Sequence, residues 1–185
     1  DSLTTEFSTR NGRKVRDGGG IVPDIQTTDD RKLNIAYYIF AQNLYFDFAT
    51  QYVSTHPTIN KPEDFTLSDE DYKTFTDFLM EKKFTYTSQT EKYYAELLSV
   101  AKLEGLDITA KAEFESLKAK LTPDVTNGLV ENKAEIIELL SLEIIKRYYF
   151  QKGEIRFALR TDKDFKIAIE KLGNAVEYGK LLMVK

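Results

Sequence analysis

Apolar side chains recur at the spacing of an amphipathic helix through most of the 185 residues, and this periodicity constrains the fold more than any other feature. Two apolar stripes follow each other between residues 31 and 54. The first is Leu33, Ala36, Tyr37, Phe40, Ala41, Leu44, Phe48 and Tyr52, and the second is Ile35, Ile39, Phe46 and Val53. We predict one long helix from Arg31 to about Ser54, preceded by N-cap candidates from Thr27 to Asp30. A helix that is apolar on two sides needs cover on both. We expect downstream helices on one side, and another domain or a second copy of the chain on the other.

Capping residues mark the helices that follow. Ser68 with Asp71, and Ser88 with Glu91, have the spacing of a capping box, in which each side chain bonds to the other residue's backbone N–H. Periodicity and caps together predict helices over 68–83, 88–105, 109–121, 124–150, 155–159 and 161–173. We expect the segment 124–150 to pack on the first long helix. The predicted fold class is mainly α, an irregular multi-helix bundle of six to eight helices with a short N-terminal β-hairpin or extended segment.

Composition excludes several classes of protein. The chain has 12 Phe and 11 Tyr but no Trp, which indicates a core filled by aromatic rings. A net charge of −4, with basic residues spread along the helices, gives no electrostatic basis for binding nucleic acid or an anionic membrane. The absence of cysteine excludes disulfides, thiol catalysis and cysteine-based metal sites.

The N-terminal stretch has a different pattern. Alternation from Leu3 to Phe7 predicts a strand, and Asn11-Gly12 is the pair best suited to a two-residue hairpin turn that leads into a second strand over 13–16. Gly18 to Gly20 follow, and then an extended run through Pro23. A glycine cluster can cradle phosphate at the start of a helix, but Ile-Val-Pro-Asp cannot open a helix here. A tight bend is the better interpretation.

These residues carry a resemblance. The strand, the pair Gly12-Arg13, the glycine-rich bend and the run of Ile21, Pro23 and Asp24 resemble the end of the peptidase domain in C-terminal processing peptidases, the tail-specific serine endopeptidases. Later segments resemble the helical C-terminal region of members from Bacteroidetes-type bacteria. These are FTYTSQTEK (84–92), AKLEG (101–105), EFESLKAKLTPDV (113–125) and IIKRYYFQKGEIRFALRTDKDFKIAI (144–169).

The resemblance implies a Ser nucleophile and a Lys general base in motifs of the GSAS and GKG type, and neither string occurs in this sequence. It implies that both, and a PDZ-like domain, lie upstream, so that the chain begins inside a folded domain. Residues 1–29 would then be the C-terminal edge of the peptidase domain and residues 30–185 a helical C-terminal domain. That domain would serve packing, access control or self-association. The resemblance also implies protein or peptide substrates, a possible homo-oligomer, and the periplasm or cell envelope of a Gram-negative bacterium.

Within the chain itself we predict no catalytic, cofactor-binding or metal-binding residues. Ser88 and Lys92 have the i, i+4 spacing of a Ser/Lys dyad, but a helix-capping Ser88 beside a solvated Lys92 explains them better. His56, the only histidine, stands beside a proline in a predicted loop, where a solvated side chain is expected. The alternative function is a free-standing helical interaction module. That alternative predicts a hairpin ordered without neighbours, whereas a protease fragment predicts a poorly packed one.

Overall fold

The computed structural model describes residues 4–10, 12–18, 20, 23–28 and 33–182. The chain forms two compact units. The first, which we call the helical body, is Lys32–Glu154. The second, the end unit, combines the two ends of the chain, Asp1–Arg31 and Ile155–Lys185. In chain order the body is therefore inserted between the two segments of the end unit.

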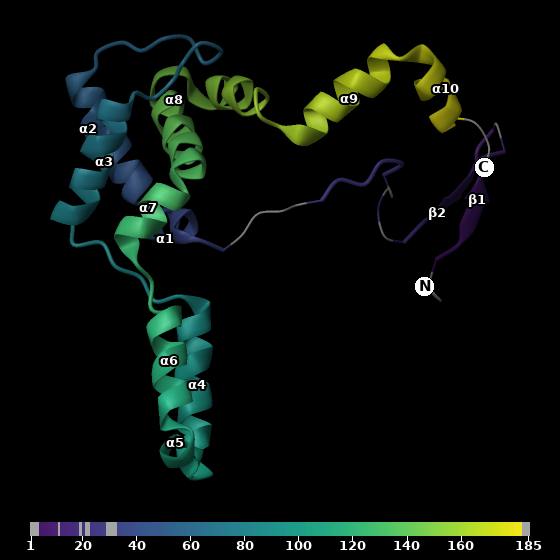
Figure 1. The fold of residues 1–185 in the computed structure, drawn as a ribbon. Coiled ribbons are helices and arrows are strands. Elements are labelled where there is room, and N and C mark those ends of the chain that lie inside the picture. The colour runs from purple at the N-terminus through teal and green to yellow at the C-terminus, as the bar shows by residue number, and fades with distance from the viewer. Residues whose placement is uncertain (1–3, 11, 19, 21–22, 29–32, 183–185) are drawn as a thin grey trace. The chain divides into compact units, whose positions relative to one another are not determined.

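The described residues are mainly helical, as predicted. They form ten helices and one two-stranded sheet, rather than six to eight helices (Figure 1). The body contains α1 (Ile35–Ala41), α2 (Leu44–Thr55), α3 (Asp69–Glu81), α4 (Gln89–Leu103), α5 (Leu106–Thr109), α6 (Lys111–Leu121), α7 (Val125–Glu131) and most of α8 (Lys133–Ala158). The end unit contains β1 (Glu6–Ser8), β2 (Lys14–Arg16), the last residues of α8, α9 (Lys163–Gly173) and α10 (Ala175–Leu182). None of the described helices is long and apolar enough to cross a bilayer.

Aromatic rings fill the centre of the body, which confirms the composition argument. Phe75 of α3 is fully buried and lies between two rings of α2. It stacks on Tyr45 with ring centroids 5.5 Å apart, and meets Phe48 edge to face at 5.1 Å. Helix α8 adds aliphatic side chains to this core, all with no exposed surface: Ile136, Leu140, Ile144 and Ile145.

The predicted helix over 31–54 is wrong as a single element. It is two helices, α1 and α2, separated at Asn43, whose φ of 59° and ψ of 20° are left-handed. Asparagine tolerates this conformation better than most residues, and the break resets the apolar phase. The buried side chains of α2 therefore include Tyr45, which lies on neither predicted stripe. The N-cap of α1 is Asn34, whose side chain accepts from the Ala36 N–H at 2.8 Å. Of the predicted caps, residues 29 and 30 lie outside the described residues.

The predicted helix over 124–150 is also wrong as a single element. It is α7, capped by Asp124, followed by α8. Gly153 indicates a helix stop in the sequence, but α8 runs on past it to Ala158. As predicted, α8 contacts the first two helices. Asn34 Nδ2 donates to Glu135 Oε2 at 2.5 Å, and Arg147 Nη2 donates to the Phe46 carbonyl at 3.0 Å. The sequence favours a core position over an exposed aromatic contact for Tyr148, Tyr149 and Phe150. Tyr148 and Tyr149 are half-buried, and the interpretation is wrong for Phe150, which is exposed.

Two further helix starts differ by one or two residues. Thr109 ends α5 instead of beginning the next helix, because Ala110, with φ −115° and ψ 30°, interrupts the helical backbone between α5 and α6. The N-cap of α9 is Asp162 and not Thr161, since the Asp162 carboxylate accepts from the Phe165 N–H at 2.7 Å.

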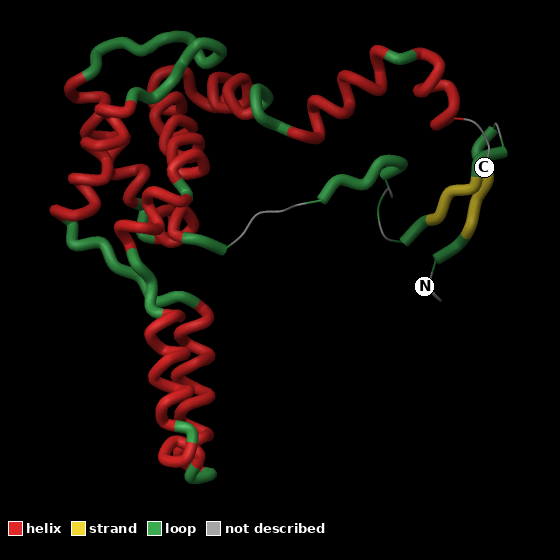
Figure 2. The backbone as a smooth tube through the Cα atoms, in the orientation of Figure 1, coloured by secondary structure: helices red, strands yellow, loops and turns green. Residues whose placement is uncertain are grey.

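Helices α4, α5 and α6 form a subsidiary part of the body, which we call the helical arm. Helices α4 and α6 run side by side and α5 joins them at one end (Figure 2). Of the arm's side chains only Tyr94 and Ala101 are buried. The Tyr94 hydroxyl donates to the Phe114 carbonyl at 2.8 Å, which fastens α4 to α6. The arm therefore keeps much of its apolar surface exposed.

The end unit begins with the predicted antiparallel hairpin. Glu6 pairs with Arg16, Phe7 with Val15 and Ser8 with Lys14. The Thr9 N–H donates to the Arg13 carbonyl at 2.8 Å, which extends this register and leaves residues 10–12 as the loop. The predicted two-residue turn is therefore wrong. A three-residue loop needs its last residue in the left-handed region, and Gly12 with φ 81° supplies it. Asn11 lies outside the described residues.

Neither strand of this hairpin has a buried residue. The same holds for α9 and α10, although Asn174 caps the second through the Glu177 N–H at 3.2 Å. The predicted domain boundary after residue 29 falls among residues 29–32, which lie outside the described residues, and it stays a prediction.

Candidate functional site

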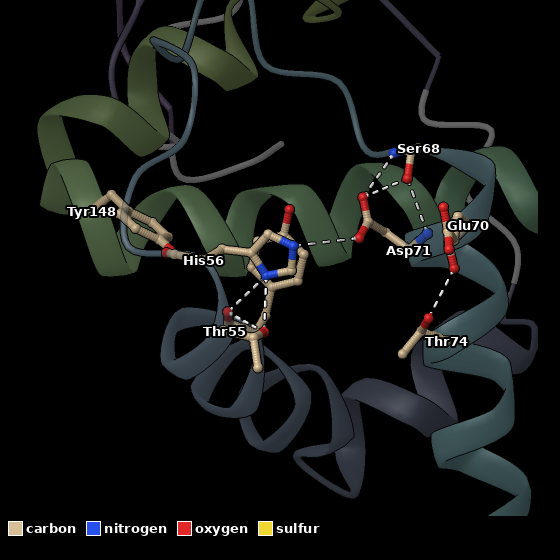
Figure 3. A network of polar contacts seen from close by, with 8 residues as sticks. Thr55, His56, Ser68, Glu70, Asp71, Thr74 and Tyr148 are labelled. Atoms are coloured by element: carbon tan, nitrogen blue, oxygen red, sulfur yellow. Dashed lines mark hydrogen bonds and ion pairs between the residues drawn. The ribbon is translucent and has the colours of Figure 1, made fainter.

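The single histidine lies where two helices of the body meet. Helix α2 ends at Thr55, and His56 is its C-cap, with its N–H donating to the Tyr52 carbonyl at 3.0 Å. Helix α3 begins after Ser68, which forms the predicted capping box with Asp71. The two helix ends bring the imidazole and the Asp71 carboxylate to the same place (Figure 3).

The imidazole is fixed on three sides. It stacks on the Tyr52 ring with centroids 3.8 Å apart and planes within 6°. Its Nδ1 lies 3.0 Å from both the Tyr52 carbonyl and the Thr55 hydroxyl, and its Nε2 lies 3.9 Å from Asp71 Oδ1. The His56 carbonyl accepts from the Tyr148 hydroxyl, which brings in α8. The interpretation of His56 as merely solvated is therefore wrong: its ring and backbone connect α2, α3 and α8.

The order of these groups does not suit nucleophilic catalysis. The Ser68 hydroxyl donates to Asp71 Oδ2 at 2.6 Å and accepts from the Asp71 N–H at 3.0 Å. The carboxylate thus lies between the hydroxyl and the imidazole. A serine nucleophile needs the base itself within hydrogen-bonding distance, with the acid behind the base. The network caps α3 and brings side chains of α2, α3 and α8 together around His56.

Buried tyrosines make the stability of the body sensitive to alkali. Burial, with a smaller contribution from Asp71, raises the pKa of Tyr52 to about 12, and burial raises that of Tyr72 to about 12. Both ionise near 10.0 when unfolded. Because the folded pKa is the higher one, their contribution to stability is complete below pH 10 and falls as the pH rises toward 12.

We therefore expect the free energy of unfolding, measured by urea denaturation, to fall between pH 10 and about 12. Tyr52→Phe should make this fall smaller, since phenylalanine does not ionise. The matched control is Tyr93→Phe, because Tyr93 is exposed and its removal should leave the pH profile as it was. A profile that Tyr52→Phe and Tyr93→Phe change equally would contradict the assignment.

The second candidate, the pair Ser88 and Lys92, is placed as a helix start. The Ser88 hydroxyl accepts from the Glu91 N–H at 3.1 Å, and Glu91 Oε2 accepts from the Ser88 N–H at 2.9 Å. Lys92 is exposed on the first turn of α4. The predicted capping box is confirmed. Its geometry directs the Ser88 hydroxyl to the backbone N–H of Glu91.

Replacing Ser88 with alanine should lower the local stability of α4 by about 1 kcal/mol, because one N–H of the first turn loses its acceptor. Hydrogen exchange of amides 89–103 measures this loss. Lys92→Ala is the control, since an exposed lysine in a helix should change stability by less than about 0.5 kcal/mol. We also expect neither change to affect peptide hydrolysis. Peptide hydrolysis that depends on Ser88 or Lys92 would instead support a catalytic dyad formed by these two residues.

The glycine-rich bend leads into no helix among the described residues: the next one in the chain is α1 at Ile35. Gly18 and Gly20 have φ of 89° and 82°, values that residues other than glycine rarely adopt. These angles agree with a bend. Gly19 lies outside the described residues. Among the described residues, no group of three or more His, Asp and Glu side chains is placed to hold a metal ion.

The structure brings together two residues that the sequence connected only by pattern. Arg13 Nη2 and Asp24 Oδ1 form an ion pair, and Arg13 Nη1 donates to the Leu181 carbonyl of α10 at 3.4 Å. Periodicity did not indicate this contact, because the partners are 11 and 168 positions away from Arg13. The one signal in the sequence was the family resemblance, which Gly12-Arg13 and Pro23-Asp24 carry on either side of the glycine-rich bend.

Comparison with known proteins identifies the helical region. Residues 35–172, from the first residue of α1 almost to the end of α9, match the sequence family described as "Probable PDZ-protease, C-terminal helical domain". Neither the curated proteins nor the solved structures give a match. Since the match covers well over half of the chain, the protein belongs to the family of C-terminal helical domains of probable PDZ-proteases.

Proposed function

We propose that this chain is the helical region of a C-terminal processing serine endopeptidase, a periplasmic or cell-envelope enzyme that cuts near the C-termini of proteins. The observation that carries the proposal is an order along the chain. Residues 3–25 resemble the end of a processing peptidase domain, and the family match to a protease's helical domain follows them in the chain, beginning at Ile35. The Ser/Lys dyad and the PDZ-like domain would lie outside these 185 residues.

The hairpin supports this proposal. Its central cross-strand pair, Phe7 and Val15, is exposed on one face, and no residue of either strand is buried. An isolated two-stranded hairpin is marginally stable in water. The hairpin is therefore the kind of element that belongs to the edge of a larger sheet, such as that of a peptidase domain.

The role that the structure favours for the body is packing. Leu33, Tyr37 and Phe40 lie at i, i+4 and i+7 on or next to α1, and between 48 and 64 % of each is exposed. The other face of α1 carries the buried Ile35, Ala36 and Ile39. One apolar face is thus satisfied by the body and the other needs a partner. We propose that the peptidase domain of the same protein covers it.

Two measurements test the enzymatic assignment. The chain by itself should hydrolyse peptides only at background, and the protein encoded by the extended upstream reading frame should be active. Replacing the serine of its GSAS-type motif with alanine should abolish that activity. An upstream frame without Ser and Lys motifs, or activity that survives the replacement, would remove the protease assignment.

A separate test concerns packing. In the extended protein Phe40→Asp should lower the rate of peptide hydrolysis and the thermal midpoint of the peptidase domain, because it places a charge in the proposed contact. Tyr93→Asp is the matched control, since it introduces the same charge on an exposed aromatic residue of the arm. Equal effects of the two changes would contradict a specific role for the α1 face.

The alternative function is a free-standing interaction module, and the arm is the observation that favours it. Tyr93, Leu97, Val100 and Leu103 lie along one side of α4 and are all more than half exposed. Under this alternative the isolated chain binds a protein partner through the arm and needs no peptidase domain. Loss of partner binding on Leu97→Asp, together with an upstream frame that lacks the catalytic motifs, would decide in its favour.

A further inference from the structure

Arg13 contacts two segments that are far from it in the sequence. Its guanidinium forms the ion pair with Asp24 through one terminal nitrogen and donates to the Leu181 carbonyl through the other. Three segments are joined in this way: the start of β2, the extended run after the glycine-rich bend, and α10. All three belong to the end unit. The planar fork of arginine suits such a contact, because its nitrogens point to two acceptors at once.

The backbone fixes the position of Arg13 before its side chain makes any contact. The Thr9 N–H donates to the Arg13 carbonyl at 2.8 Å, and the Arg13 N–H donates to the Thr9 hydroxyl at 3.1 Å. Gly12 closes the loop just before it with a left-handed φ of 81°. The arginine side chain therefore leaves the hairpin from a constrained turn, and it is the least exposed of the hairpin's charged groups that form ion pairs, at 29 %.

The acceptor on α10 is a backbone carbonyl. Leu181 lies in the described part of α10, Ala175–Leu182, and its carbonyl accepts from Arg13 Nη1 at 3.4 Å. A carbonyl oxygen has two lone pairs, so it can accept from a side chain in addition to any backbone donor. Arg13 thus adds a side-chain contact between the hairpin and α10.

Most residues of helices α9 and α10 are exposed. Lys171 joins them through Glu177 at 2.7 Å, but neither helix has a buried residue. Their apolar side chains Ile167, Leu172, Tyr178 and Leu181 line an open groove whose other wall is the run 23–27. Asp24 lies in one wall of this groove and Leu181 in the other. The Arg13 side chain contacts both and so connects the two walls.

We propose that Arg13 is a positioning residue that fastens α10 to the hairpin and to the Pro23-Asp24 segment. Helices α9 and α10 are then part of the same unit as the hairpin, and the helical body is inserted into that unit and not appended to it. If the hairpin is the edge of a peptidase domain, as proposed above, the chain returns to that domain after the body. This last step rests on the proposed function, whereas the contact itself does not.

Hydrogen exchange of the 185-residue chain tests the proposal. Arg13→Gln should speed the exchange of amides 175–182 and 24–28 by about two- to fivefold, the range for a partly exposed ion pair. Exchange in α3 and in residues 133–149 should not change. Arg13→Lys should give a smaller increase than Arg13→Gln, because an ammonium retains the charge but not the fork.

The matched control is Arg16→Gln, which removes a neighbouring arginine that pairs only with Glu6 across the hairpin, at 3.9 Å. It should leave amides 175–182 unchanged. If Arg13→Gln and Arg16→Gln act alike on α10, or if Arg13→Gln affects only residues 4–17, Arg13 does not position α10. Hydrogen exchange does not depend on any peptidase activity of the protein. A negative result here would therefore leave the protease assignment untouched, because that assignment is decided by the upstream motifs and the hydrolysis assay.

Discussion

Replacing Phe75 with alanine should lower the free energy of unfolding of the helical body by about 3–5 kcal/mol, the usual cost of deleting a buried aromatic ring. Phe75 has no exposed surface, and it contacts rings of two helices, with Phe48 at 5.1 Å and Phe78 at 6.3 Å between centroids. The cavity would open where α2 and α3 meet. Since domains of this size have total stabilities of about 5–15 kcal/mol, the change should take away a large part of the total.

Urea denaturation followed by circular dichroism measures this loss, because the body is mainly helical. The matched control is Phe40→Ala. It deletes the same ring from α1, where 64 % of the side chain is exposed, and should change the free energy by less than about 0.5 kcal/mol in the isolated chain. Similar losses for the two variants would mean that the aromatic cluster is not the centre of the core.

The helix caps and the helical period of α3 could be predicted from the sequence, because both depend on residues close together in the chain. The capping boxes at Ser68 and Ser88 involve residues three positions apart, and both form as predicted. The helical period of residues 68–83 predicts Tyr72, Phe75, Phe78 and Leu79 as the inward residues of α3, and all four are buried. A cap and a period depend on few neighbours, so one sequence was enough.

The errors lie where the backbone departs from a continuous helix. Nothing in the apolar period distinguishes a helix through Asn43 from two helices that meet there, because Asn43 takes a left-handed conformation without a change in composition. The fixed environment of His56 was missed for another reason. Its partners Tyr52, Asp71 and Tyr148 come from three helices, and only tertiary packing brings them together. The family came from resemblance, since no catalytic group of the chain indicates it.

The interruption of α8 leads to the second prediction. Phe150 has φ 55° and ψ −161°, a conformation close to the region that glycine alone adopts readily. At 75 % exposure its ring contributes little packing. Phe150→Gly should relieve backbone strain of about 1–3 kcal/mol. Glycine also raises the chain entropy of the unfolded state, which offsets part of this gain. We therefore expect a net stabilisation of the body by about 1 kcal/mol.

Gly153→Ala should have the opposite effect, a loss of about 1–3 kcal/mol. The kink brings the two turns so close that an added Cβ at 153 would overlap the Cβ of Tyr149 and lie 3.2 Å from Ile145 Cγ2. An uninterrupted helix predicts the reverse for both variants, because there glycine costs about 1 kcal/mol relative to alanine and is unfavourable in place of phenylalanine. The signs of the two changes in urea denaturation therefore decide whether α8 is broken at Phe150. Gly173→Ala, where nothing lies within 4 Å of an added Cβ, is the control for the substitution itself.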